Sequence, residues 1–215
     1  NGIIQELTGL LRTKNIGTDS DRALLLDFQA TLETKPEKAI KLEKDALAQI
    51  ETITADNARL VSNLHANLGG LYRMNAHPDL AKEHMEKSIS LLDQFNLLHI
   101  NDSIPQIANY AMFLTEQQEP ERGISELQKL SGIIKEYHSD DCLDYAKVQE
   151  TLGTIYLMTA NLPQAKTHFK RAFKIYEKIW ADEPEMIEAK YQEIQELYPQ
   201  IGFCIGKNLS GLLTK

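Results

Sequence analysis

The sequence has few of the residues from which metal, redox and catalytic sites are built. Its 215 residues include two cysteines, six histidines and one tryptophan. Cys142 and Cys204 lie far apart and form no CxxC motif, which suits a reducing compartment, and we interpret both as small buried apolar side chains. No HExxH motif and no Cys/His pairing at metal-ligand spacing occurs. We therefore expect no metal, no cofactor and no enzymatic activity.

Other features that the sequence lacks limit the classes of partner that the protein can bind. No run of about 18 apolar residues is present, so no segment is expected to span a membrane. The chain lacks the GxxxxGK[ST] and GxGxxG loops that hold phosphates. A net charge of −8 and a pI near 5.3 argue against nucleic acid and anionic membrane as partners, because such binders usually carry a basic face. We expect a cytoplasmic location, although the chain begins at Asn1, so a leading segment could have been removed.

Apolar residues recur at steps of three and four along most of the chain, which predicts amphipathic helices. One stripe runs from Leu60 to Tyr72, His77-Pro78 interrupts it, and a second runs from Leu80 to Leu92. Pro78 suits the first turn of a helix, where its missing N–H costs nothing. The same design returns over residues 145–176, with a break at Leu162-Pro163. The pattern predicts pairs of helices joined by tight turns.

The helix pairs follow a fixed period. Ala39, Ala81, Gly123 and Ala165 each stand 42 positions after the last, and prolines at 36, 78, 120 and 163 keep the same interval to within one position. Self-similarity at 20 to 50 residues indicates a repeat array, in which each unit buries its apolar face against its neighbours.

Two of the copies carry a recognisable motif. The matching positions are Asn67-Leu68-Gly69, Tyr72, Ala81, Met85 and Ser88 in one copy, and Thr151-Leu152-Gly153, Tyr156, Ala165, Phe169 and Ala172 in the other. These residues resemble the tetratricopeptide (TPR) pattern of LG-x2-Y followed by A-x3-F-x2-A. Gly69, Gly153 and Ala111 are expected to let the two helices of a repeat approach closely. Armadillo and HEAT repeats share the length range but lack the LG-x2-Y spacing.

The resemblance implies an all-α, TPR-type right-handed superhelix of antiparallel helix pairs, with about ten helices. A period of 42 adds about one turn to each helix of the usual 34-residue repeat, as in repeats of kinesin light chains and bacterial peptide-sensing regulators. We expect a single array over 1–215. Its parts are an N-terminal helix (1–18), four repeats (19–60, 61–102, 103–144 and 145–182) and a C-terminal helix or capping segment (183–215).

The resemblance also implies a binding surface, because the first helices of successive repeats line the concave side of such an array. The residues placed there are Asn63, Asn67, Arg73, Asn109, Met112, Lys147, Glu150, Thr151 and Thr154. Asn67 and Asn109 occupy positions where related repeats carry a groove asparagine, whose amide could fix the backbone of an extended peptide.

These expectations describe a non-catalytic scaffold that binds a protein or peptide. The alternative is the sensor domain of a bacterial peptide-responsive regulator whose output domain lies outside this chain. The apolar C-terminal segment from Ile201 to Leu213 either folds back on the last groove, or contacts another copy or a missing domain.

Overall fold

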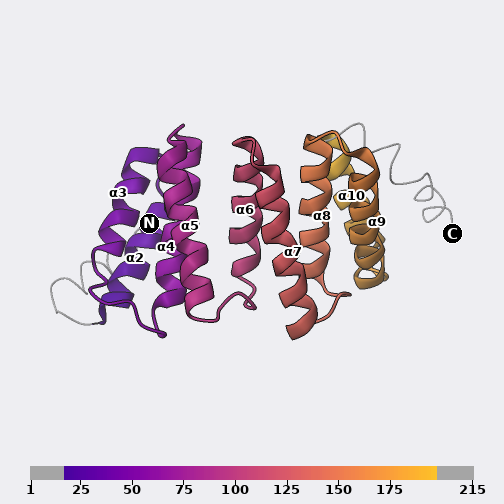
Figure 1. The fold of residues 1–215 in the computed structure, drawn as a ribbon. Coiled ribbons are helices and arrows are strands. Elements are labelled where there is room, and N and C mark those ends of the chain that lie inside the picture. Colours follow the sequence, from indigo (N-terminus) through magenta and orange to yellow (C-terminus); the bar gives the residue numbers. More distant parts are fainter. Residues whose placement is uncertain (1–16, 198–215) are drawn as a thin grey trace. The chain divides into compact units, whose positions relative to one another are not determined.

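The computed structural model describes residues 17–197, and every regular element in that range is an α-helix (Figure 1). The nine helices of the described range are α2 (Asp19–Thr31), α3 (Pro36–Leu47), α4 (Ala58–Met74), α5 (Pro78–Gln94), α6 (Ser103–Glu116), α7 (Pro120–Tyr137), α8 (Leu143–Met158), α9 (Leu162–Ile179) and α10 (Pro184–Leu197). The expected N-terminal helix and the segment after Leu197 lie outside the described residues.

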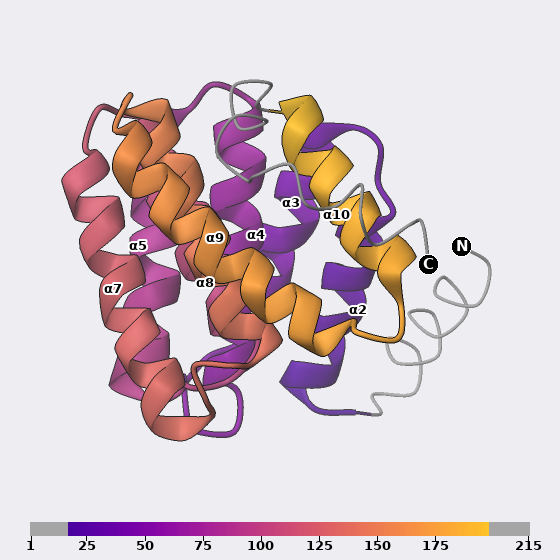
Figure 2. The ribbon, with the colours of Figure 1, turned by 90° about the vertical axis from the view of Figure 1, so that its right-hand side faces the viewer.

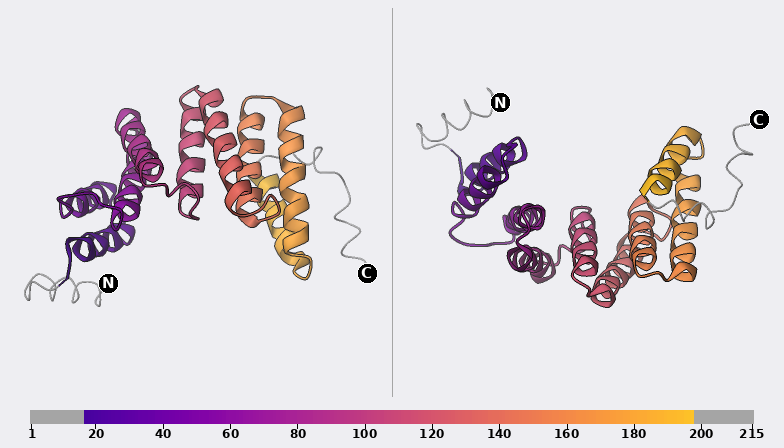
Figure 3. Two further views of the ribbon diagram at one scale, coloured as in Figure 1. Left: turned by 60° about the horizontal axis from the view of Figure 1, so that its bottom comes forward. Right: turned by 90° about the horizontal axis from the view of Figure 1, so that it is seen from above.

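The chain forms two compact units, which divide within α6 between Phe113 and Leu114. In the first unit, α2 pairs with α3 and α4 pairs with α5, and α3 also contacts α4. In the second unit, α8 pairs with α9, α7 packs against α8, and α10 contacts α9 (Figures 2 and 3). The core of the α2–α3 pair is completed by Leu64 of α4, which is fully buried beside Ala23, Leu26 and Ala46.

The predicted proline breaks are confirmed, because α3, α5, α7 and α9 each begin with a proline in the first two positions. Three of the turns before them share one geometry. Ala76, Gln118 and Ala160, again 42 apart, have positive φ angles of 57°, 65° and 59°. The next N–H then reaches back across the helix end, from His77 to the Tyr72 carbonyl at 2.9 Å and from Asn161 to the Tyr156 carbonyl at 2.7 Å. These are Schellman turns, which satisfy carbonyls at the end of the first helix of each pair.

The predicted close approach at two glycines is also confirmed. A Cβ atom added to Gly69 would lie 2.6 Å from Cγ of Met85, and one added to Gly153 would lie 2.9 Å from the ring of Phe169. Both contacts join the two helices of one pair, and both partners are buried. Only a residue without a side chain fits such a distance, so these glycines set how close the helices pack.

One cysteine interpretation is wrong. Cys142 is half-buried and lies at the N-cap of α8, where its Sγ accepts a hydrogen bond from the Tyr145 N–H at 3.4 Å. A serine-like capping role therefore replaces the apolar packing that the sequence suggested. Cys204 lies outside the described residues. In the described range, no helix is long and apolar enough to cross a bilayer.

Candidate ligand-binding surface

An apolar stripe runs along the exposed side of α2. Leu24, Phe28 and Leu32 follow one another at steps of four, and 41%, 50% and 51% of their surfaces are exposed. Residues at this spacing lie on one face of a helix. In the other helices of the described range, at most two large apolar side chains are exposed. Isolated apolar side chains are normal at protein surfaces, whereas neighbouring ones on a single helix face form a candidate contact surface.

The equivalent positions of the neighbouring first helix, α4, are also small or apolar. By the 42-residue register, Leu24, Phe28 and Leu32 of α2 correspond to Ala66, Gly70 and Met74 of α4. Met74 is 80% exposed, and a Cβ atom added to Gly70 would meet no heavy atom within 4 Å. Gly70 therefore leaves open space beside its backbone, unlike Gly69, where the pairing helix fills that space.

Asn67 of α4 links the two first helices of this unit. Its side-chain N–H group donates to Asp27 Oδ1 of α2 at 2.8 Å and to Glu43 Oε1 of α3 at 3.2 Å. Asp27 is half-buried, whereas Glu43 is buried with 2% of its surface exposed. Both donor hydrogens are thus directed at carboxyl groups of the preceding repeat, and the carbonyl oxygen of Asn67 is the atom that remains to accept from a ligand.

Asp27 and Glu43, which we call the acid pair, interact with each other and both accept from Asn67. Burial, the negative charge of Asp27 and the hydrogen bond between the two carboxyls together raise the pKa of Glu43 to about 8, against the hydrogen bond from Asn67. Burial also raises the pKa of Asp27, against the hydrogen bonds from Glu43 and Asn67. Glu43 is consequently a neutral acid at pH 7 and donates to Asp27. Its second carboxyl oxygen, Oε2, is buried and accepts no hydrogen bond within the described residues, so ionisation of Glu43 would leave this oxygen without a donor.

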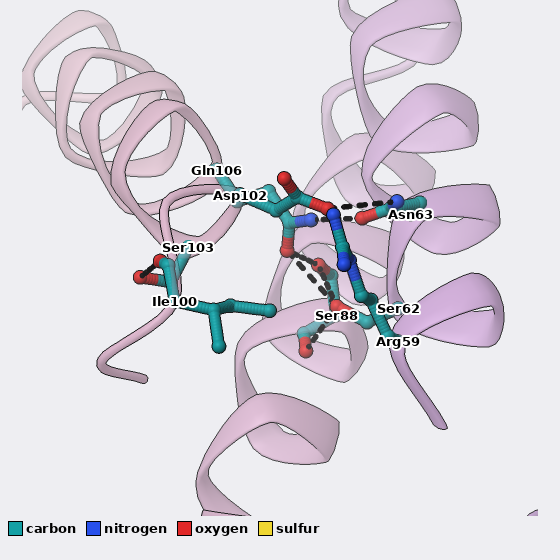
Figure 4. Close-up of polar contacts among 8 residues, drawn as sticks. All are labelled: Arg59, Ser62, Asn63, Ser88, Ile100, Asp102, Ser103 and Gln106. Carbon is teal, nitrogen blue, oxygen red and sulfur yellow. Dashed lines mark hydrogen bonds and ion pairs between the residues drawn. The ribbon is translucent and has the colours of Figure 1, made fainter. Parts of the chain in front are cut away.

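Asn63 belongs to a polar network between α4, α5 and α6 (Figure 4). Its carbonyl oxygen accepts from the Gln106 amide at 2.5 Å, and the hydroxyls of Ser62 and Ser88 converge on the Gln106 carbonyl oxygen at 2.9 and 2.6 Å. At the edge of the network, Arg59 Nε donates to Asp102 Oδ2 at 2.6 Å. The carboxylate of Asp102 has a lowered pKa because of this bond. Asn63 therefore holds α6 against α4, and its amide is largely occupied.

The other groove residues predicted in the first unit differ in how far they are exposed. Arg73 and Met112 are half-buried. Asn109 is exposed, and its side chain makes no hydrogen bond within the described residues. Asn67 bonds to Asp27 and Glu43 of the preceding repeat. The equivalent residues for Asn109, one period later, are Gly69 and Met85, whose side chains offer no polar group. Asn109 is thus the asparagine of the predicted pair whose amide is available to a ligand.

In the second unit, the predicted residues mostly bond within the fold. Lys147 lies 3.7 Å from Asp144 one turn earlier, and the hydroxyls of Thr151 and Thr154 donate to carbonyls of their own helix at 3.0 and 3.1 Å. Glu150 accepts from the Tyr176 hydroxyl at 2.6 Å and from Lys190 Nζ at 3.3 Å. Glu150 therefore connects α8 to both α9 and α10.

Sequence reasoning missed a pair of linked polar side chains that recurs in the two best repeats. His65 and His84 join α4 to α5 through their Nδ1 atoms at 2.8 Å, and Gln149 and His168 join α8 to α9 at 2.9 Å. His84 stacks on Tyr72, and His168 stacks on Tyr156. Each residue of one set lies 84 positions, or two periods, from its counterpart. The 84-residue spacing of His84 and His168 is the sequence signal for this pair. Without the register, the six histidines show no pattern.

No group of three or more His, Cys, Asp or Glu side chains within residues 17–197 is placed to hold a metal ion. The acid pair with Asn67, the Asn63 network and the Glu150 contacts all lie where helices meet. They consist of carboxyls, amides and hydroxyls that bond to one another, and this arrangement positions helices.

The fold and these contacts define an array of TPR-type helix pairs. Residues 103–178 match the family model described as tetratricopeptide repeat. Residues 103–178 therefore carry tetratricopeptide repeats, and both the resemblance and the all-α fold class inferred from the sequence are confirmed. No curated protein matches the chain in sequence.

Three solved structures are similar to this chain in fold. BtubC (BKLC) from P. vanneervenii is 19% identical, with a TM-score of 0.66 over 81% of this chain and 70% of that one. TPR-like repeats of a Podosopora anserina protein assigned as a kinesin light chain are 15% identical, with a TM-score of 0.66 over 84% and 90% of the two chains. MamA is 14% identical, with a TM-score of 0.55 over 81% and 87%. TPR folds are typical of protein-interaction scaffolds, which are generally non-catalytic.

Proposed function

We propose that this chain is a non-catalytic scaffold that binds a peptide segment of a partner protein on the exposed face of α2 and α4. The observation that supports this function is the apolar stripe of Leu24, Phe28 and Leu32. Burying large apolar side chains is favourable by about 1.5–3 kcal/mol each, so a stripe left exposed by the fold is available to a partner.

The charges beside the stripe define the chemistry of the partner segment. α2 carries Asp19, Asp21 and Asp27 and a single cation, Arg22, which pairs with Asp19. Asp21 is exposed at the helix start, and hydrogen bonds from Thr18 lower its pKa, so it is ionised at neutral pH. A segment with apolar side chains flanked by lysine or arginine is complementary to this surface. The chain's net charge of −8 favours the same kind of partner.

The sensor alternative requires a pocket that encloses a short peptide. The stripe on α2 is about half exposed along its whole length. This openness supports a scaffold that binds part of a larger protein over a sensor that encloses a free peptide. Asn109 is the amide best placed to add a backbone hydrogen bond to such a segment. A cytoplasmic location and self-association through the C-terminal segment remain predictions.

Selection of peptides from a random displayed library with the full chain tests the proposal. The selected peptides should combine apolar and basic residues, and binding measured by fluorescence polarisation should fall at least about tenfold in Phe28→Ser/Leu32→Ser, as for loss of an apolar anchor. Met158→Ser/Leu162→Ser removes two exposed apolar side chains from the second unit and serves as the control. The proposed surface would be contradicted if the selected peptides bound both variants with the same affinity as the unaltered chain.

A further inference from the structure

The acid pair occupies a position where the other repeats place an apolar contact. By the 42-residue register, Asp27 corresponds to Gly69 and Gly153, and Glu43 corresponds to Met85 and Phe169. In those repeats a glycine receives a large apolar side chain from the second helix at 2.6 or 2.9 Å. The first repeat therefore replaces its closest helix–helix contact with two carboxyl groups.

Exposure to solvent does not explain why a carboxyl group stands at position 43. Glu43 is as buried as the apolar residues that it replaces, with 2% of its surface exposed against 5% for Met85 and 0% for Phe169. Burying a carboxyl group without a cation is costly unless it keeps its proton and bonds to another group. The contact between α2 and α3 therefore depends on one proton.

Within residues 17–197, no cation is placed to stabilise a second negative charge at the acid pair. From α2, Glu43 faces Asp27, and from α4 it faces the uncharged Asn67. On α3, the adjacent Lys44 directs its ammonium over the ring of Tyr72, 5.8 Å from the ring centre, and its charge acts on His84. Among the described residues, Asp27 is the charged group that acts on Glu43, and it has the same sign.

We propose that the acid pair is a proton-operated contact that holds the first repeat together while Glu43 is protonated and loosens α2 and α3 when Glu43 ionises. Loss of the proton removes the hydrogen bond between the two carboxyls and leaves two negative charges side by side. Asn67, which donates to both carboxyls, transmits the change to α4. The equivalent contacts at Gly69 and Gly153 hold no titratable group, so the loosening is confined to the first repeat.

The direction in which stability changes with pH follows from the raised pKa of Glu43. Glu43 ionises at a pKa near 4.5 in the unfolded chain and near 8 in the fold. The folded state holds the proton between these values, so its stability falls as the pH rises from about 4.5 to about 8. The structural loosening accompanies ionisation of the folded state and is centred at the upper value.

Hydrogen exchange measured by mass spectrometry over pH 6.5–9, on the full chain and corrected for intrinsic rates, tests the proposal. Protection of peptides from α2 and α3 should fall with a midpoint near pH 8, relative to peptides from α8 and α9 in the same sample. Glu43→Gln keeps the shape and can still donate to Asp27 but cannot ionise, so this pH dependence should disappear. Asp27→Gly/Glu43→Met, which copies the Gly69–Met85 contact, should also remove it.

The proposal would be overturned if, in the unaltered chain, the protection of α2 and α3 changed with pH in the same way as that of α8 and α9. It would also be overturned if Glu43→Gln kept the midpoint near pH 8. The test does not depend on a ligand, so its outcome is independent of the proposed binding surface. Should the double variant fold poorly, Glu43→Gln alone decides, because it preserves every contact of the protonated state.

Discussion

The ring of Phe169 in α9 lies directly against the backbone of Gly153 in α8, so that a Cβ atom on Gly153 would be 2.9 Å from two ring carbons. Phe169 is fully buried and its ring cannot move aside without displacing its neighbours. Overpacking of this kind costs about 1–3 kcal/mol, and the better helix propensity of alanine returns up to about 1 kcal/mol. We therefore expect Gly153→Ala to lower the free energy of unfolding by about 1–2 kcal/mol in a urea titration.

Gly132 provides the matched control, because a Cβ atom there would meet no heavy atom within 4 Å. It lies within α7, where alanine is favoured over glycine. Gly132→Ala should raise the free energy of unfolding by about 0.5–1 kcal/mol. If both substitutions shifted stability in the same direction, packing against Phe169 would not explain the first result.

The linked histidines of the second repeat predict a loss of stability in acid. Burial and the positive charges of His84 and Lys87 together lower the pKa of His65 to about 4. At 2.8 Å, one neutral Nδ1–H donates to the other Nδ1, and two protonated rings cannot make this bond. The unfolded chain binds the proton near pH 6.5, so stability is lost as the pH falls from about 6.5 to about 4.

We expect a decrease of about 1–2 kcal/mol for this pair between pH 7 and 4.5, discounted because both rings are partly exposed. His65→Gln copies Gln149, which bonds to His168 at the equivalent place. This variant should keep the link to His84 and lose less stability in acid than the unaltered chain. Urea titrations of both proteins at the two pH values give the difference directly. Equal acid sensitivity would show that the His65–His84 contact does not titrate as described.

Much of the fold could be predicted because its determinants are local. Prolines at 36, 78, 120 and 163 fall at the starts of the second helices, and the glycines of the LG pairs fall at the close contacts. The turn geometry could not be predicted. Ala76, Gln118 and Ala160 adopt the left-handed conformation that usually indicates glycine or asparagine. Their carbonyl-satisfying hydrogen bonds override that local preference.

The candidate surface was predicted less well, because side-chain bonds between helices depend on more than one repeat at once. Asn67 and Asn109 looked equivalent in the sequence, yet Asn67 donates to the acid pair whereas Asn109 does not bond within the described residues. The contact of Asn67 with buried Glu43 makes Asn109→Ala the cleaner probe of peptide binding.

Glu150, which stays a predicted residue of the binding face, joins three helices through Tyr176 and Lys190. Burial raises the pKa of Tyr176 above its usual range, so the phenol keeps its proton and donates to Glu150 at 2.6 Å. Tyr176→Phe would remove that donor and leave Glu150 with Lys190 alone. Hydrogen bonds to charged groups contribute about 1.5–3 kcal/mol, so we expect a loss of unfolding free energy in that range.

The same substitution should loosen α10, since Lys190 lies 3.3 Å from Glu150 and 2.9 Å from Glu193 and depends on both carboxylates. Limited proteolysis in the turn between α9 and α10 should therefore be faster in Tyr176→Phe. Tyr191→Phe is the control, because Tyr191 makes a ring contact with Phe173 and its hydroxyl makes no hydrogen bond within the described residues. That variant should differ from the unaltered chain by less than about 0.5 kcal/mol. Equal cleavage of the two variants would show that the Tyr176–Glu150 bond does not hold α10 in place.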